Sequence, residues 1–402
     1  MKTFEYRGYD LAGHMAKGLI EGLDLKDARE KLSARGVLAE RLAPAGAGRA
    51  RSLEGRQTAL DLERRAVMYR ELATLSNAGL PLAHALDVLI QAPERETEAI
   101  RLAGVRDRLR EGQGFADAWS AIGPEITPFE KAVLVSGERA GTIGDVLHQL
   151  AGYLDEQEKL RDSVISALIY PAIVTGLALL VGISMFGFII PTISDLFRES
   201  RIELPVLTRM ILAAGRVTSL FGIPVLLAAG AGVMMWIRQL KSDAVVRERW
   251  EQRLFDVPFA GKGYRLLANL RFSRTMSLLL RGGVPIVEAM ELAGAATGST
   301  WLRRCLHAEA NSVRDGRTLA QALRNVGPLG GSLPGWIQAG EASGDLDKML
   351  EQAAERYQQQ WSRFVRRVTV IIEPVLILAV GLFVLIVALA ILMPIMQLNK
   401  AM

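Results

Sequence analysis

The order of hydrophobic and polar residues along the chain contains three long stretches without charge. The first, ALIYPAIVTGLALLVGISMFGFIIPTI, lies between Asp162 and Asp195, where no charged residue occurs. A helix needs about 20 apolar residues to cross a bilayer, and an Arg at its centre would cost about 2.5–3.5 kcal/mol. Two more stretches run from Val217 to Ile237 and from Pro374 to Asn399. The pattern therefore predicts transmembrane helices at 166–193, 217–237 and 370–396.

Basic residues around the third stretch set the expected orientation. Arg363, Arg366 and Arg367 precede it, and only Lys400 follows it. Because positive flanks stay in the cytoplasm, three spans place the N-terminus there. Residues 194–216 then form a short external loop and 397–402 an external tail. Four Arg residues in that loop oppose this orientation, and five basic residues between Arg238 and Arg253 narrowly outweigh them.

The first 43 residues predict a small N-terminal α/β unit. TFEYRGYD alternates as a strand does, and HMAKGLIEGL follows as a second strand. DLKDAREKLSARG then reads as a short helix, with Asp24 as its N-cap and Gly36 just past its end. The next segment, 44–60, is rich in Ala, Gly and Arg and is predicted to be a flexible linker.

From residue 61 the pattern becomes helical, and it then occurs a second time. RELATLSNAGLPLAHAL, from Arg70, aligns with RTMSLLLRGGVPIVEAM, from Arg274. GERAGTIGDVL, from Gly137, aligns with GEASGDLDKML, from Gly340, after the loss of one residue in the second copy. We therefore expect two helical bundles, at 61–165 and 238–369, each directly before a membrane span.

Glycine and proline explain much of the repeated pattern. Gly79 and Gly283 can take the left-handed conformation that ends a helix, and Pro81 and Pro285 can open the next one. Gly141 and Gly344 are expected to end helices in the same way.

Other residues of the repeated phrase have different predicted roles. Thr142 can cap the following helix with Asp145 as its partner, and Asp345 can do so in the second copy. Gly137 and Gly141, which are four residues apart, would also let another helix approach closely. Glu138 and Glu341 gain no local partner in this scheme, and they are the acidic positions to test.

Composition narrows the range of functions. The chain is 50% hydrophobic but only 6% aromatic, and its net charge is +5. Its Arg residues form no aromatic-interleaved patch, so the charge suits an anionic membrane surface and not nucleic acid. Cys305 is the only cysteine, which excludes an intrachain disulfide. FAGKGY lacks the first glycine of a phosphate loop. The sequence contains no recognisable cluster of residues for a nucleophile or a metal site, so we expect that the protein is not an enzyme.

One carboxylate stands out near the third span. Glu373 directly precedes Pro374 at the start of the apolar stretch. An ionisable group there should face protein or reach the interface. Its role is either interfacial anchoring with Arg366 or a functional contact.

Several of these features together resemble one family. They are the two Gly-Glu-x-x-Gly phrases, the glycine–proline hairpins, ALIYP with Tyr170 and Pro171, and IIEP with Glu373 and Pro374. The composite is similar to the type II secretion F family, the inner-membrane platform proteins of bacterial type II secretion and type IV pilus machines. It covers nearly the whole chain. It implies an all-α membrane protein with two cytoplasmic bundles, three transmembrane helices and the small α/β unit.

The resemblance also implies a function. Such platforms guide the assembly of pilin-like subunits, with energy from a separate ATPase. The expected partners are a cytoplasmic secretion ATPase, other inner-membrane assembly proteins, pseudopilins, membrane lipids and further copies of the chain. Tyr6, where pilus members often have Trp, favours secretion. A pilus platform is the alternative, and a transporter or channel subunit is a second one.

The resemblance raises one question about cofactors. Some members are similar to cation binders at acidic residues that include the Glu of the repeated phrase. Here Thr142 and Ala83–His84 stand where further acids would complete a site around Glu138, so we expect no cofactor. Only the second copy has both Glu341 and Asp345. The small-residue stretch Ala228–Gly232 could receive a pseudopilin helix or pack within the platform.

Overall fold

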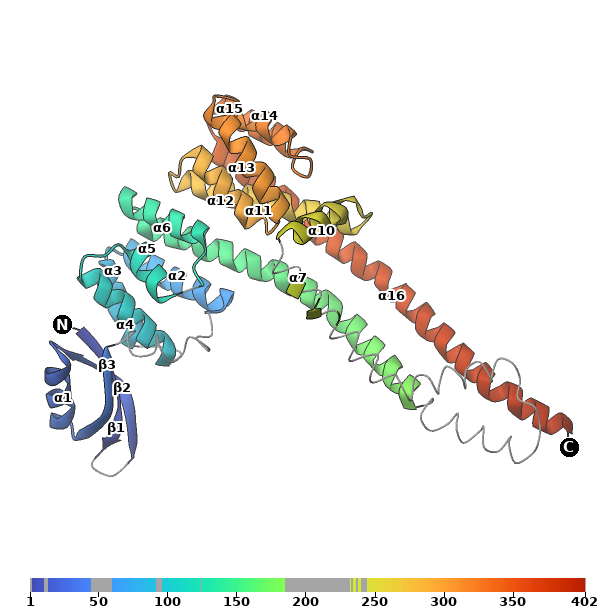
Figure 1. Cartoon of the computed structure of the whole chain (residues 1–402), viewed down its shortest axis with the longest axis horizontal. Coiled ribbons are helices and arrows are strands. Elements are labelled where there is room, and N and C mark those ends of the chain that lie inside the picture. Colours follow the sequence, from blue (N-terminus) through green and yellow to red (C-terminus); the bar gives the residue numbers. More distant parts are fainter. Residues whose placement is uncertain are drawn as a thin grey trace. The chain divides into compact units, whose positions relative to one another are not determined.

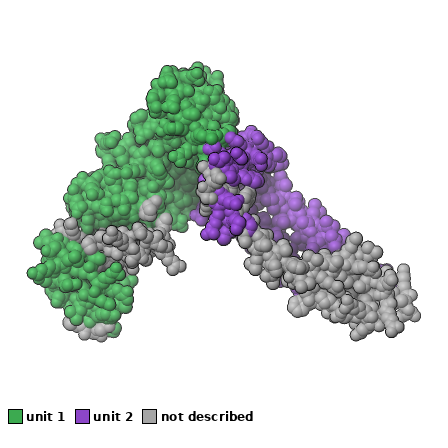
Figure 2. Space-filling view, in the orientation of Figure 1, with its two compact units in different colours: residues 1–160, 267–356 green, residues 161–266, 357–402 purple. Residues whose placement is uncertain are grey.

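The computed structural model describes residues 2–10, 14–44, 60–91, 96–123, 125–184, 232, 234–235, 238–239 and 244–401. They belong to two compact units, one formed by residues 1–160 and 267–356 and the other by 161–266 and 357–402 (Figure 2). The predicted loop at 194–216, nearly all of the predicted second span and of the predicted linker, and most of Ala228–Gly232 lie outside the described residues.

The N-terminal unit is a three-stranded antiparallel sheet with one helix. Its elements are β1 (Lys2–Asp10), β2 (Met15–Gly22), α1 (Leu25–Ala34) and β3 (Val37–Pro44), and the strand order is β2-β1-β3. Phe4, Ile20, Ala28 and Leu32 form its buried core. The side chain of Asp24 accepts a hydrogen bond from Asp27 N at 2.8 Å, so it caps α1 as expected.

Strand β3 was not anticipated from the sequence. Its pairing with β1 shifts register between Arg7 and Gly8, which lie opposite Arg41 and Ala39. Glu40 is therefore the extra residue of a bulge, and beyond it the side chains exchange faces. Val37 and Ala39 pack on the core before the bulge, and Leu42 does so after it. This exchange hides the simple alternation by which a strand is recognised.

Among the described residues, the first bundle contains six helices, α2 to α7, in sequence (Figure 1). They are α2 (Leu62–Asn77), α3 (Leu82–Gln91), α4 (Glu96–Arg110), α5 (Phe115–Ile122), α6 (Pro128–Ala140) and α7 (Ile143–Ser184). Tyr69, Leu72, Phe115 and Leu134 are among its fully buried side chains.

The described residues of the second bundle form six equivalent helices, α11 to α16, in the same order, and one further helix, α10, precedes them. After α10 (Ala244–Asp256) come α11 (Ala260–Arg281), α12 (Ile286–Ala296), α13 (Thr300–Arg314), α14 (Leu319–Arg324), α15 (Leu333–Ser343) and α16 (Leu346–Ala401). The helices α2 to α7 correspond one to one with α11 to α16. The sequence repeat is thus a structural repeat.

Glycines end the equivalent helices of both bundles. Gly79, Gly141, Gly283 and Gly344 all have positive φ, between 71° and 89°. After the first hairpin helix, Leu80 N donates to Leu75 O at 3.1 Å, and Val284 N donates to Leu279 O at 2.9 Å in the second copy. These bonds close the helix ends, as the sequence predicted. Pro81 and Pro285 directly precede the first residues of α3 and α12.

The last helix of each bundle continues as a long apolar rod. Within the described residues, α7 and α16 are the two helices long and apolar enough to cross a membrane. Leu177 is 62% exposed on α7 and Leu378 is 73% exposed on α16. Apolar side chains so exposed over many turns fit a lipid environment. Pro171 lies inside α7 and Pro374 inside α16, so both helices are continuous through these prolines.

Candidate functional site

Glu138 of the first repeated phrase caps a helix in its own bundle. Its Oε1 accepts a hydrogen bond from Phe115 N, and its Oε2 accepts one from Ala116 N at 3.3 Å. These are the first two amides of α5, whose N-cap residue Gly114 has no side chain to offer. A carboxylate at a helix N-terminus satisfies unpaired N–H groups and interacts favourably with the helix dipole.

Glu341 of the second phrase makes the same contacts. Its Oε1 accepts from Leu319 N at 2.6 Å and its Oε2 from Ala320 N at 3.3 Å, at the start of α14. Here Thr318 also caps the helix, because its hydroxyl accepts from Gln321 N at 3.2 Å. In both copies, the Glu of the repeated phrase therefore has backbone amides more than twenty residues earlier in the chain as its partners. No residue close to the Glu in sequence supplies this contact.

The phrase's first glycine allows the next helix to come close. A Cβ on Gly137 would lie 2.7 Å from Val146 Cγ2, and one on Gly340 would lie 2.8 Å from Leu346 Cα. Real Cβ atoms do not approach other atoms so closely. The repeated phrase therefore joins three helices: the one that carries it, the one that follows and the one that its Glu caps.

The two bundles contact each other within the first compact unit. The Ser136 hydroxyl of α6 donates to the carbonyl oxygen of Gly282, at the hairpin between α11 and α12. Arg274 of α11 forms an ion pair with Glu156 of α7. Val133, one turn before Ser136, is completely buried. Helices α6 and α7 of the first copy thus hold the first hairpin of the second copy.

A buried ion pair distinguishes the first bundle. Arg65 Nη1 lies 2.8 Å from both carboxylate oxygens of Glu130, and both side chains are almost fully buried. Arg65 also donates to Glu125 O at 3.0 Å, and Tyr69 donates its hydroxyl to Glu130 at 3.1 Å. Burial, followed by the Glu130 charge, raises the pKa of Tyr69 well above its usual value.

No local sequence pattern indicates this pair. Its partners are far apart in the chain, and the second copy replaces them with Asn269 and Leu333. Asn269 still donates to the carbonyl oxygen that corresponds to that of Glu125, which is Pro328 O at 2.9 Å. The only signal of this pair in the sequence is the comparison of the two copies. The first copy has Arg65 and Glu130 where the second copy has the uncharged residues Asn269 and Leu333.

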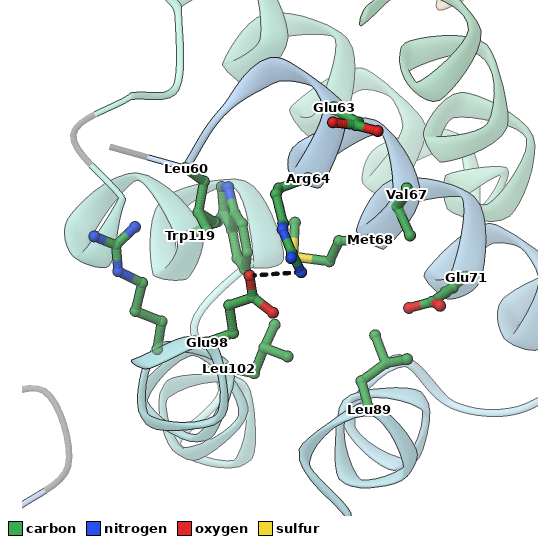
Figure 3. A pocket seen from close by; sticks show the side chains of 11 residues that line it. Leu60, Glu63, Arg64, Val67, Met68, Glu71, Leu89, Glu98, Leu102 and Trp119 are labelled. Atoms are coloured by element: carbon green, nitrogen blue, oxygen red, sulfur yellow. Dashed lines mark ion pairs between the residues drawn. The ribbon is translucent and has the colours of Figure 1, made fainter. Parts of the chain in front are cut away.

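A cavity of about 180 Å³ lies among helices α2 to α5 of the first bundle. Figure 3 shows Arg64 and Glu98 facing each other across it as an ion pair, with Trp119 and Met68 beside them. At the equivalent positions, the second bundle has Ala268, Leu302, Leu323 and Phe272, all buried. The cavity is therefore a feature of the first copy. Its lining supplies no recognisable reaction centre.

The candidate residues beside the two apolar stretches lie on α7 and α16. Tyr170 is half exposed, next to Pro171, and Glu373 is exposed, next to Pro374. Farther along, in the second compact unit, a Cβ on Gly182 would meet Phe383 at 3.1 Å, so the two helices pack closely there. The site roles of these residues stay predictions.

No group of three or more His, Cys, Asp or Glu side chains suited to a metal ion occurs among the described residues. Around Glu138 the carboxylate is already occupied by two backbone amides. Asp345 does not join Glu341; its Oδ1 accepts from Lys348 Nζ at 2.8 Å.

Comparison with protein families gives a match over most of the chain. The family described as "Type II secretion system (T2SS), protein F" matches twice, at residues 68–191 and 272–394, and its N-terminal domain matches residues 1–39. The chain belongs to the type II secretion F family. The two matched segments of this F-family protein coincide with the two structural copies, including the start of each apolar rod.

Individual relatives of the F-family chain align along its whole length. The type II secretion system protein F of Pseudomonas aeruginosa is 30% identical over 403 residues, which cover 100% of this chain and 99% of the relative. That of Vibrio cholerae is 28% identical, with complete coverage of both. The type IV pilus assembly protein PilC of Thermus thermophilus is 30% identical over 96% of this chain and 95% of its own.

Proposed function

We propose that the chain is the inner-membrane platform of a bacterial type II secretion system. The full-length similarity to type II secretion F proteins carries this proposal. The duplicated architecture supports it, because each helical bundle runs without a break into an apolar helix. A movement imposed on a bundle would be passed along a continuous helix to the membrane.

The platform would use three membrane helices with the N-terminus in the cytoplasm. Two of them are the apolar parts of α7 and α16. The uncharged stretch at 217–237 would be the third, and it returns the chain to the cytoplasm before the second bundle. The basic residues before the last span support this orientation.

Labelling of single cysteines tests this topology. Native Cys305 is partly exposed in the second bundle and should react with an impermeant maleimide only after the cells are opened. In a Cys305→Ser background, Ser200→Cys and Ala401→Cys should be labelled from outside. External labelling of Cys305 in intact cells would refute the orientation.

The platform would not be an enzyme. A cytoplasmic ATPase would supply energy, and pseudopilins would be added to the growing fibre at the membrane helices. Other inner-membrane assembly proteins would surround it. The charged surfaces of the bundles suit polar contacts with the ATPase, whereas the exposed apolar side chains of α7 and α16 suit lipid and pseudopilin helices.

Recruitment of the ATPase tests the central claim. In cells that contain the other secretion components, loss of this chain should reduce the membrane-bound fraction of the ATPase and stop export of a reporter protein. A Gly152→Ala chain, altered at an exposed helical glycine, serves as the matched control and should restore both. Unchanged ATPase recruitment without the chain would contradict the proposal.

A pilus platform is a second candidate, because the Thermus PilC protein has the same 30% identity to this chain as the Pseudomonas secretion protein. Complementation separates the two. Rescue of protein export in a secretion-deficient strain favours the first function, and rescue of surface pili in a pilus-deficient strain favours the second.

A further inference from the structure

The contact between the bundles joins two different parts of the structural repeat. The first copy contributes its "bundle face", formed by Val133, Ser136 and Tyr153 on α6 and α7. The second copy contributes its "hairpin tip", formed by Thr275, Gly282 and Gly283 on α11 and the following turn. Ser136 donates to Gly282 O, and Tyr153 lies beside Thr275. The contact is therefore head to tail.

Because the chain is duplicated, the same two surfaces occur once more. The second copy has its own bundle face, at Trp336, Ala339 and Arg356, the positions equivalent to Val133, Ser136 and Tyr153. The first copy has its own hairpin tip, at Glu71, Ala78 and Gly79, equivalent to Thr275, Gly282 and Gly283. Among the described residues, the first face contacts the second tip. The second face and the first tip are then the two ends of this arrangement.

Exposure at these ends agrees with this assignment. A Cβ on Gly283 would lie 3.5 Å from Ser136 Oγ, whereas one on Gly79 would meet none of the described atoms within 4 Å. Val133 is completely buried, whereas its equivalent Trp336 is only partly buried. Ala78 and Ala339, which correspond to the hydrogen-bonded pair Gly282 and Ser136, are both exposed.

Chemistry at the two ends is complementary. Where Tyr153 lies beside Thr275 inside the chain, the equivalent residues are Arg356 and Glu71, which are exposed and oppositely charged. Where Ser136 meets Gly282, the equivalents are two alanines that permit close approach. Trp336 adds a large, partly exposed ring, and Trp is a residue type enriched at the centres of protein interfaces.

We propose that the bundle face of the second copy binds the hairpin tip of the first copy in another molecule of this chain. The contact would repeat the geometry seen between the two bundles, with Ala339 against Ala78 and Arg356 beside Glu71. Such a head-to-tail interface is heterologous, so further copies can be added until the assembly closes. It requires neither ATPase nor pseudopilin, so its absence would leave the proposed platform function intact.

Disulfide crosslinking of full-length chains in membranes tests this interface. In a Cys305→Ser background, one tagged chain carries Ala339→Cys and a second, differently tagged chain carries Ala78→Cys. Disulfides form only when the two Cα atoms come within about 7 Å. We expect mild oxidation of the mixed chains to give a dimer that carries both tags. Its yield should be several-fold higher than that of the same-tag dimer formed by either single-cysteine chain alone.

Two controls make the result decisive. Ser136→Cys with Gly282→Cys in one chain should crosslink within the monomer and so report that the parent contact is folded. Ala339→Cys paired with Glu30→Cys, an exposed position on α1, measures random collisions. A yield for Ala339 with Ala78 no higher than this collision level, while the internal pair crosslinks, would overturn the proposal.

Charge reversal then tests the predicted pairing. Arg356→Glu in the Ala339→Cys chain, or Glu71→Arg in the Ala78→Cys chain, should each lower the dimer yield several-fold. Both changes together should restore most of it. Single reversals that leave the yield unchanged, or a double reversal that rescues nothing, would refute the Arg356–Glu71 contact.

Discussion

Glu341 binds the start of α14 through Leu319, and this contact has a counterpart in the other half of the chain. The carboxylate accepts Leu319 N at 2.6 Å, just as Glu138 accepts Phe115 N. In each copy, the Glu of the repeated phrase connects the helix before the long rod to a short helix across the bundle. The phrase occurs in both copies because its Glu caps a short helix and its first Gly allows close helix packing in each bundle.

Removal of these carboxylates should destabilise both bundles, but unequally. We expect Glu138→Ala to lower the free energy of unfolding by about 1–2 kcal/mol, since two amides of α5 lose their acceptor. Glu341→Ala should cost less, because Thr318 continues to cap α14. Thermal unfolding of the detergent-purified protein measures both.

Glu138→Gln serves as the control, because it keeps a carbonyl acceptor and loses the charge; it should fall between the wild type and Glu138→Ala. If Glu138→Ala unfolds at the wild-type temperature, the cap contributes nothing and the carboxylate must serve another purpose.

The buried pair Arg65–Glu130 should be costly to break from one side. Glu130→Leu alone leaves Arg65 charged and buried, which typically costs about 3–5 kcal/mol. The double change Arg65→Asn with Glu130→Leu introduces the residues that the second copy uses, Asn269 and Leu333. We expect it to recover much of the lost stability in the same unfolding assay.

Recovery would show that the single-variant loss comes from an unpaired charge. A double variant as unstable as the sum of the two single variants would instead mean that the first bundle depends on the ion pair itself.

Gly79 and Gly152 should respond in opposite directions to Ala. Gly79 has a φ of +89° at a helix end, so Gly79→Ala is expected to cost about 1 kcal/mol. Gly152 lies inside α7, is exposed and has open space at its Cβ position. Gly152→Ala should stabilise by about 0.5–1 kcal/mol. The unfolding temperatures of the two variants, compared with that of the wild type, test both predictions. A higher unfolding temperature for Gly79→Ala would exclude a left-handed conformation at this helix end.

Divalent cations should not change the stability of the protein. Glu138 already accepts two amides, and Thr142 supplies no carboxylate beside it. Addition of Ca²⁺ or of a chelator should leave the unfolding temperature unchanged. A cation-dependent rise that Glu138→Gln abolishes would demonstrate a site despite this arrangement.

The sequence was sufficient to predict those features whose free energies depend on residues close together in the chain. Positive φ at Gly79, Gly141, Gly283 and Gly344 follows from the freedom of a residue without Cβ. The apolar rods follow from a continuous excess of transfer free energy over about 20 residues. The duplication needed only comparison of the chain with itself.

Long-range partners could not be predicted in this way. Strand β3 was missed because its bulge exchanges the inward and outward faces. Arg65 and Glu130 looked like ordinary surface charges until the fold buried them together. The residues of the bundle face and the hairpin tip carried no common motif.

The sequence by itself thus determined two helical copies, the ends of their helices and the apolar rods, because each depends on neighbours within a few turns of the chain. Only the tertiary structure decided that Glu138 and Glu341 cap helices and which surface of one copy holds the other. Those contacts join residues far apart along the chain, and their positions are fixed only after the helices have packed.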